Sequence, residues 1–209
     1  LGHQGEIVML SADADPPCDR PNLSKDYLAG NAPEEWIPLR SDDWYREHSV
    51  ELRLETEVKS IDTTDRAVVL ASGERLGFDR LLLATGSEPR RLGEEGFGGD
   101  NVLTLRTLAD ARALIERAKK GTKIAIIGSS FIGLEAAAAL TARGLTVEIV
   151  SPEHVPFERV LGQEIGAFLQ VQDVAASGRE VDAVLAAPDD RRRGNVRHDP
   201  ARIEASDRA

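Results

Sequence analysis

The turn Gly128–Gly133, with the sequence Gly-Ser-Ser-Phe-Ile-Gly, has the residue types and spacing needed to bind a dinucleotide. Glycine at the first position lets the chain turn sharply after a strand, and glycine at the last lets the following helix approach closely. The free N–H groups at the start of that helix can then bind a pyrophosphate. The predicted binding residues are Gly128, Ser129, Ser130, Phe131, Ile132 and Gly133. Ser130 replaces the usual middle glycine, and the alternative is a tight turn that binds no ligand.

The residue that contacts the adenosine ribose in such a unit lies at the end of the second strand, about 20 residues after the glycines. In this sequence it is Ser151. An acidic residue at this position favours NAD and a nearby arginine favours NADP. Ser151 is neither, and Glu148, Glu153 and His154 are imperfect substitutes. The sequence therefore leaves the choice between NADH and NADPH open.

The elements on either side of the turn are those that a dinucleotide-binding unit requires. The β-branched run Lys123–Ile127 predicts a buried strand, and the alanine-rich segment Leu134–Arg143 predicts a helix. Gly144 follows where a left-handed cap ends a helix, and Thr146–Val150 predicts a second, parallel strand. The expected fold class is α/β, with a Rossmann-like three-layer arrangement.

The rest of the chain contains mostly short elements and turns. Ser11–Asn22 is rich in proline and is predicted to be a loop, after which Ser24 is expected to cap a short helix. From Val171 onwards the periodicity is lost, which predicts a disordered tail. Strands are predicted at Glu6–Leu10, Val50–Leu54, Glu57–Asp62, Ala67–Ala71, Arg80–Ala84 and Val102–Leu105, the middle four as a meander, and helices at Ser41–His48 and Leu108–Lys119.

The composition excludes several classes of function. The 209 residues include 26 basic and 36 acidic side chains, a net charge of -10, which disfavours nucleic acid and anionic membranes as partners. The sequence has neither a run that could span a bilayer nor a signal-peptide pattern, so a cytoplasmic location is predicted. Cys18 is the only cysteine, so no internal disulfide or cysteine-rich metal site is expected. Any redox chemistry must come from a bound cofactor.

Several motifs occur together in a fixed order. They are Pro17-Cys-Asp-Arg-Pro-Asn-Leu-Ser-Lys25, Ala84-Thr-Gly86, Leu105-Arg-Thr-Leu-Ala-Asp110, Gly128-Ser-Ser-Phe-Ile-Gly-Leu-Glu135 and Val155-Pro-Phe-Glu-Arg-Val-Leu-Gly162. Taken as a set, they resemble the pyridine nucleotide-disulfide oxidoreductase superfamily, in its ferredoxin reductase and apoptosis-inducing-factor-like branch.

This resemblance implies an enzyme that binds FAD in one domain and NAD(P)H in another. It passes a hydride to the flavin and then electrons to a ferredoxin-like protein or a small acceptor. Lys25 and Glu135 are the catalytic residues that the resemblance implies, forming an ion pair across the two cofactors. Without the resemblance, Lys25 is a solvated loop lysine and Glu135 a first-turn acid favoured by the helix dipole.

The resemblance also implies a set of contacts to FAD. Arg20 and Lys25 match the loop beside the cofactor, and Asp13 lies near the acid that contacts its ribose. The strand end Ala84, Thr85 and Gly86 matches the backbone that touches FAD, although a strand followed by a simple turn is the alternative.

The expected domains are a partial FAD-binding domain at 1–104, a partial NAD(P)-binding domain at 105–170 and an aberrant tail at 171–209. The resemblance implies a fold truncated at both ends, because the first FAD-binding strand, glycine turn and helix would precede Leu1. Two alternatives to an active enzyme therefore remain, a non-enzymatic NAD(H)-binding module and an inactive fragment.

Overall fold

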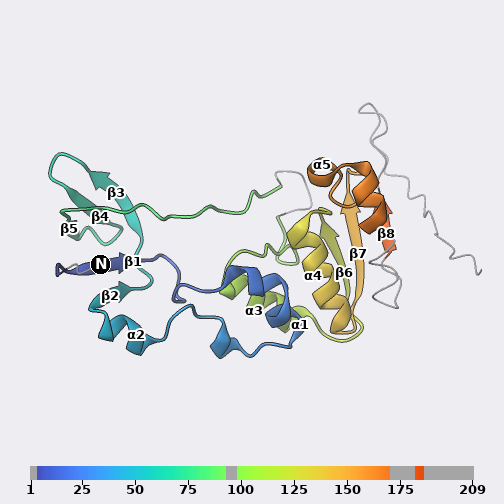
Figure 1. Ribbon diagram of the computed structural model, residues 1–209, viewed down its shortest axis with the longest axis horizontal. Coiled ribbons are helices and arrows are strands. Elements are labelled where there is room, and N and C mark those ends of the chain that lie inside the picture. The colour runs from blue at the N-terminus through green and yellow to red at the C-terminus, as the bar shows by residue number, and fades with distance from the viewer. Residues whose placement is uncertain (1–3, 93–97, 170–181, 186–209) are drawn as a thin grey trace, which may run out of the picture. The chain divides into compact units, whose positions relative to one another are not determined.

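The computed structural model describes residues 4–92, 98–169 and 182–185 (Figure 1). The chain divides into two compact units. The first unit contains Leu1–Leu23 and Pro33–Arg112, and the second contains Ser24–Ala32 and Ala113–Ala209. The domain boundaries at 104 and 170 stay a prediction, but the grouping of Ser24–Ala32 with the second unit was not foreseen.

The first unit begins with two strands that pair in parallel. β1 (Ile7–Leu10) lies beside β2 (Val50–Arg53), with Ile7 opposite Val50. The segment between them contains η1 (Arg20–Ser24), α1 (Asp26–Ala29), η2 (Glu34–Trp36) and α2 (Asp42–Glu47). The helix predicted at Ser41–His48 is confirmed as α2, and the Ser41 hydroxyl accepts a hydrogen bond of 3.3 Å from Trp44 N–H.

The first unit also contains an antiparallel meander, which differs from the predicted one. It consists of β3 (Val58–Asp62), β4 (Ala67–Leu70) and β5 (Arg75–Gly77), so β2 does not take part and β5 was not predicted. The strands predicted at Arg80–Ala84 and Val102–Leu105 are wrong. Both segments are irregular, and Leu82 is 86% exposed. An apolar run becomes a strand only beside a partner that completes its hydrogen bonds, and neither run pairs with another described strand.

Helix α3 (Leu108–Arg117) confirms the amphipathic helix predicted from the sequence. It begins with a reciprocal cap, because Asp110 accepts hydrogen bonds of 2.9 Å from the N–H groups of Arg106 and Thr107, and the Thr107 hydroxyl accepts from Asp110 N–H at 3.0 Å. Arg112 then ties the helix to the proline-rich loop through two parallel bonds of 2.9 Å to Asp15. These contacts fix the loop that carries Asp13 and Arg20.

The second unit is built on a parallel sheet in the order β6-β7-β8. The predicted strands are confirmed as β6 (Lys123–Ile127) and β7 (Thr146–Ser151), with Ile127 opposite Val150. The predicted burial of Lys123–Ile127 is wrong, because alternate residues of β6 are exposed and Ile127 is 53% exposed. β8 (Asp182–Leu185) pairs with β7. The disorder predicted from Val171 onwards is therefore wrong for β8, and the rest of that tail lies outside the described residues.

Helix α4 (Phe131–Ala142) connects β6 to β7 and begins three residues earlier than predicted. Its small side chains let it pack closely on β7, and Ala136, Ala137 and Leu140 of the helix are buried, as is Val147 of the strand. Gly144 has φ +86, which confirms the predicted left-handed residue after the helix. The strand that follows it, β7, ends close to α5 (Glu158–Leu161), and residues 163–169 are also helical.

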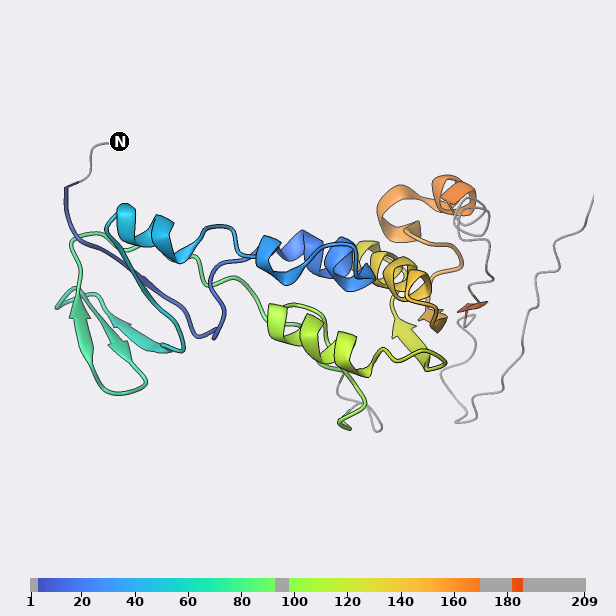
Figure 2. The ribbon, with the colours of Figure 1, turned by 90° about the horizontal axis from the view of Figure 1, so that it is seen from below.

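Helix α1 belongs to the second unit and packs against α4 in both views (Figure 1, Figure 2). Arg143, at the end of α4, donates hydrogen bonds to the carbonyl oxygens of Tyr27 and Leu28. Ser24 does not cap α1, contrary to the prediction, because Lys25 is the N-cap residue. The Arg143 contacts attach the short segment after Lys25 to a long helix and so hold the lysine backbone in place.

The glycine turn brings the start of α4 close to the end of β6. Gly128 has φ +112, a conformation that favours glycine, and its N–H donates to the Val150 carbonyl at 2.8 Å. A Cβ atom on Gly133 would lie 2.2 Å from the Gly128 carbonyl oxygen, so any side chain there must push the helix away from the turn. None of the helices in the described ranges is long and apolar enough to cross a membrane.

We expect Gly133→Ala to destabilise the second unit, because the added methyl group collides with a backbone atom that cannot rotate away. The free energy of unfolding should fall by about 1–3 kcal/mol, the usual cost of overpacking. Thermal unfolding followed by circular dichroism measures the change. The matched control is Gly77→Ala, where a Cβ atom would lie 4.0 Å from its nearest neighbour, and equal effects of the two substitutions would contradict the packing argument.

Candidate functional site

A buried hydroxyl and an ammonium group converge on one carboxylate in the second unit. Glu135 lies in the first turn of α4, directly after the glycine turn. Its Oε2 accepts a hydrogen bond of 2.6 Å from the Ser24 hydroxyl and one of 2.9 Å from Lys25 Nζ. The ion pair implied by the resemblance is therefore present, although 110 residues separate its partners along the chain. Ser24, which is 5% exposed, was not predicted to contribute to it.

The environment of Glu135 lowers the pKa of its carboxyl group. Partial burial acts in the opposite direction, but the hydrogen bonds from Ser24 and Lys25 and the positive charge of Lys25 together outweigh it. Glu135 is therefore ionised at neutral pH. It can hold the lysine ammonium group at a fixed position beside the glycine turn.

The glycine turn itself fits a phosphate group. A Cβ atom on Gly128 would meet no described atom within 4 Å, so the space beside its backbone is open. Ser130 is the N-cap residue of α4, yet its hydroxyl makes no cap hydrogen bond within the described structure. The first-turn amides thus face an open space without a side-chain cap, as an anion site at a helix N-terminus requires. Phe131 and Ile132 are exposed beside it, whereas Ser129 is buried.

The structure places Ser151 away from solvent. This residue is 1% exposed, and its hydroxyl lies 2.7 Å from the Ser129 hydroxyl. It also donates a hydrogen bond to Glu153. The hydroxyl is thus committed to protein partners at the end of β7, where no ribose can reach it directly.

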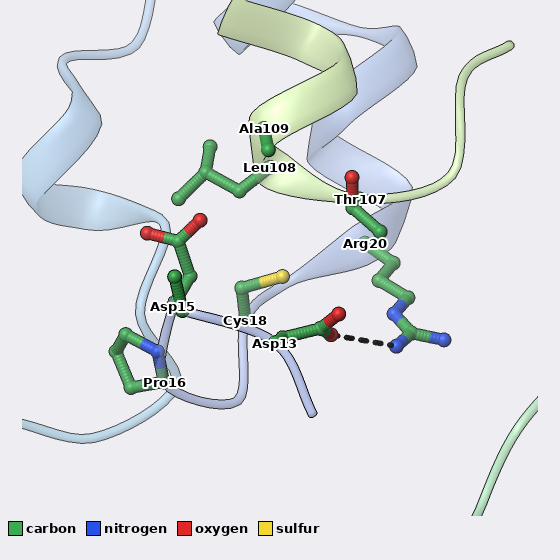
Figure 3. A pocket seen from close by; sticks show the side chains of 9 residues that line it. Asp13, Asp15, Pro16, Cys18, Arg20, Thr107, Leu108 and Ala109 are labelled. Atoms are coloured by element: carbon green, nitrogen blue, oxygen red, sulfur yellow. Dashed lines mark ion pairs between the residues drawn. The ribbon is translucent and has the colours of Figure 1, made fainter. Parts of the chain in front are cut away.

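In the first unit, a small pocket lies between the proline-rich loop and the start of α3 (Figure 3). Asp13 and Arg20 form an ion pair of 3.8 Å on one side of it, and the Cys18 thiol points into it. Burial raises the pKa of this thiol, and the opposing effect of Arg20 is smaller. The protonated form of the Cys18 thiol is therefore favoured in this pocket.

Two guanidinium groups lie near Gly86 in the same unit. This glycine has φ +69, and a Cβ atom on it would lie 3.5 Å from Arg20 and 3.7 Å from Arg106. Arg106 also donates to the Ser87 carbonyl at 3.1 Å. Positive side chains around a bare backbone segment suit an anionic group. That Arg20 and Gly86 contact FAD stays a prediction. Arg106 was missed, although it belongs to the motif Leu105–Asp110.

The other predicted flavin contacts, Ala84 and Thr85, are exposed in the irregular segment that precedes Gly86. Nothing in the described ranges groups three or more possible metal ligands. His48 is exposed and stacks on Trp44, with ring centroids 4.1 Å apart.

The parallel pair β6–β7, the glycine turn and helix α4 define a Rossmann-type dinucleotide-binding fold. The chain belongs to the pyridine nucleotide-disulphide oxidoreductase family, which it matches over residues 2–178.

Relatives of this chain include human apoptosis-inducing factor 3, which is 35% identical over 168 residues, 80% of this chain and 27% of that protein. The ferredoxin–NAD(+) reductase component of the anthranilate 1,2-dioxygenase system of Burkholderia cepacia is 38% identical over 162 residues, 78% of this chain and 40% of that protein. The chain thus spans between about a quarter and two fifths of the length of these relatives.

Solved structures agree with this assignment. The crystal structure of the covalent putidaredoxin reductase–putidaredoxin complex matches with a TM-score of 0.81 and 33% identity, covering 88% of this chain and 44% of that chain. The ferredoxin reductase for the CYP199A2 system from Rhodopseudomonas palustris matches with a TM-score of 0.80 and 30% identity, covering 88% of this chain and 45% of that chain. The expected FAD/NAD(P)-binding fold is confirmed.

We expect Ser24→Ala to raise the pKa of Glu135, because it removes a hydrogen bond that stabilises the ionised carboxylate. Titration of the glutamate side chains by carbon-13 NMR measures this pKa. Ser41→Ala, which removes the helix-capping hydroxyl in the first unit, is the matched control and should leave the Glu135 titration unchanged. An unaltered titration in Ser24→Ala would show that Lys25 alone holds the carboxylate.

Proposed function

We propose that the chain functions as an FAD-dependent NAD(P)H oxidoreductase that delivers electrons to a ferredoxin-like acceptor. The observation that carries this proposal is the Lys25–Glu135 pair of 2.9 Å, which lies directly after the glycine turn. A simple dinucleotide-binding turn does not require a lysine held in this way. The ferredoxin reductases among the relatives support the same conclusion.

The residues divide into two groups by their surroundings. The turn Gly128–Gly133 would hold the pyrophosphate of NAD(P)H through its open backbone and the helix N-terminus. Asp13, Arg20 and the segment Ala84–Gly86 would hold FAD, together with the newly found Arg106. FAD, when bound, supplies the ring system that accepts a hydride and passes electrons on.

Lys25 and Glu135 would act as a charged pair beside the reacting groups. A lysine side chain is flexible, and the carboxylate restricts it to a small region. The Lys25 side chain is half exposed and can therefore reach a ligand, while Glu135 stays ionised and cannot give up a proton at neutral pH. Lys25, held in place by Glu135, thus contributes a positive charge beside the negative charge that develops on hydride acceptance.

The acceptor is proposed from the relatives alone. One solved structure is a covalent complex of a reductase with putidaredoxin, and several relatives are named as ferredoxin–NAD(+) reductases. The cytoplasmic location stays a prediction from the composition.

We expect the chain to accelerate the bleaching of FAD by NADH under anaerobic conditions, with FAD in excess so that weak binding does not hide the reaction. Visible absorption of the flavin is the measurement, and FAD with NADH but no protein is the reference. A rate equal to this reference, with NADH still bound by calorimetry, would contradict the proposal and favour a non-enzymatic nucleotide-binding module.

We expect Lys25→Ala to slow flavin reduction by about tenfold or more, because a positive charge near the developing negative charge is lost. The affinity for NADH should change much less, since the glycine turn is intact. Stopped-flow reduction at several NADH concentrations separates the two effects. Lys59→Ala, at an exposed lysine of β3, is the control, and equal reduction rates in both variants would exclude Lys25 from the reaction.

A further inference from the structure

The Ser24 hydroxyl and the Lys25 ammonium group bind the same oxygen of Glu135. The hydroxyl donates to Oε2 at 2.6 Å, and Lys25 Nζ donates to Oε2 at 2.9 Å. Because the two bonds end on one atom, the lysine can leave without any rotation of the carboxylate. The serine then still holds that oxygen.

The two donors differ in how firmly they are held. Ser24 is 5% exposed, whereas the Lys25 side chain is 48% exposed. A hydrogen bond from a buried hydroxyl to a carboxylate is strong, and an ion pair with a solvated lysine is weak. The serine is thus the durable partner of Glu135, and the lysine is the exchangeable one.

The backbone that carries Lys25 is fixed independently of its side chain. The Ala29 N–H donates to the Lys25 carbonyl oxygen at 2.8 Å. Arg143 holds the carbonyl oxygens of Tyr27 and Leu28 from the end of α4. A lysine carries its charge on a flexible stem. Movement is therefore confined to that stem and the ammonium group.

The carboxylate of Glu135 keeps a stabilising donor when the ammonium group departs. Burial raises the pKa of this carboxyl group, and among the contacts that lower it the hydrogen bond from Ser24 has the largest effect, ahead of the bond and the charge of Lys25. The elements packed against α4 carry three further charged residues, none of which pairs with Glu135 in the described ranges, namely Asp26 in α1, Lys123 in β6 and Glu148 in β7.

We propose that Ser24 is a positioning residue, which holds the Glu135 carboxylate in place while the Lys25 ammonium group moves from it to a negatively charged ligand. In the resting chain Glu135 keeps the lysine beside the glycine turn. Once a hydride has been accepted, the negative charge on the acceptor offers the lysine a second partner. The serine stops the vacated carboxylate from following, so the lysine can return. This inference deepens the proposed function, because the ligand is the reduced flavin of the same reaction.

Carbon-13 NMR of the Lys25 and Glu135 side chains follows the two partners separately. The probe is FAD reduced with dithionite and added in excess under anaerobic conditions, so the chain need not transfer a hydride. The Lys25 Cε signal should shift more than with oxidised FAD, whereas the Glu135 Cδ signal should stay near its position in the free chain. In Ser24→Ala both signals should shift. Ser41→Ala, which removes a hydroxyl from the first unit, is the matched control and should behave as the wild type.

The pH dependence of flavin reduction by NADH gives a second readout. Without the Ser24 hydroxyl, Glu135 is protonated at a higher pH and no longer attracts Lys25. The rate in Ser24→Ala should therefore fall several-fold between neutral and mildly acidic pH. The wild type and Ser24→Thr, which keeps a hydroxyl, should change much less. The affinity for NADH, measured by calorimetry, should be alike in all three.

Other results would overturn the inference. Wild-type signals that shift together would show that the pair moves as a unit, and signals that both stay would show that Lys25 does not exchange. A pH profile of Ser24→Ala identical to that of the wild type would remove Ser24 from this role. A wild-type chain that shows the lysine shift but reduces no flavin with NADH would support the exchange and contradict the proposed function instead. The wild-type spectra decide the exchange if Ser24→Ala does not fold.

Discussion

The second unit depends on the close approach of Gly133 to the Gly128 carbonyl oxygen. This contact is possible only without a side chain, and it fixes where α4 begins relative to the end of β6. Two consequences follow from that position. The helix presents its first amides beside an open backbone, and Glu135, two residues after Gly133, lies where Ser24 and Lys25 can reach it. The proposed nucleotide site and the placement of the Lys25–Glu135 pair thus share one steric cause.

A second constraint acts at the opposite end of α4. Arg143 donates to the carbonyl oxygens of Tyr27 and Leu28, so α1 is attached to the end of the same helix that carries Glu135 at its start. A four-residue helix has little stability of its own, because its few internal hydrogen bonds do not compensate for the loss of chain entropy. Lys25 is therefore positioned by tertiary contacts at the two ends of α4. Glu135 at the start of the helix pairs with the lysine side chain, and Arg143 at its end holds the segment that follows the lysine.

The sequence predicted the unit around the turn well because its signals are local. The β-branched strands, the alanine-rich helix and Gly144 each specify a backbone conformation within a few residues. The failures have long-range causes. The apolar run at Arg80–Ala84 has the composition of a strand, but pairing depends on a neighbour that composition does not reveal. The missed hydrogen bond from Ser24 to Glu135 and the pairing of Glu153 with Ser129 likewise connect residues that are distant along the chain.

The carboxylates of Glu135 and Glu153 have the same kinds of hydrogen-bonding and charged partners. In each case a buried serine hydroxyl donates to the carboxylate, a basic side chain pairs with it, and the pKa is lowered against the effect of burial. A glutamate in the unfolded chain has a pKa of about 4.3. Both groups therefore stabilise the folded state above that value, and this contribution is lost as the pH falls through their lower folded-state pKa values. At neutral pH both carboxylates are charged acceptors. One of them holds the Lys25 ammonium group beside the glycine turn, and the other is held by Ser129 and Ser151 just after the end of β7.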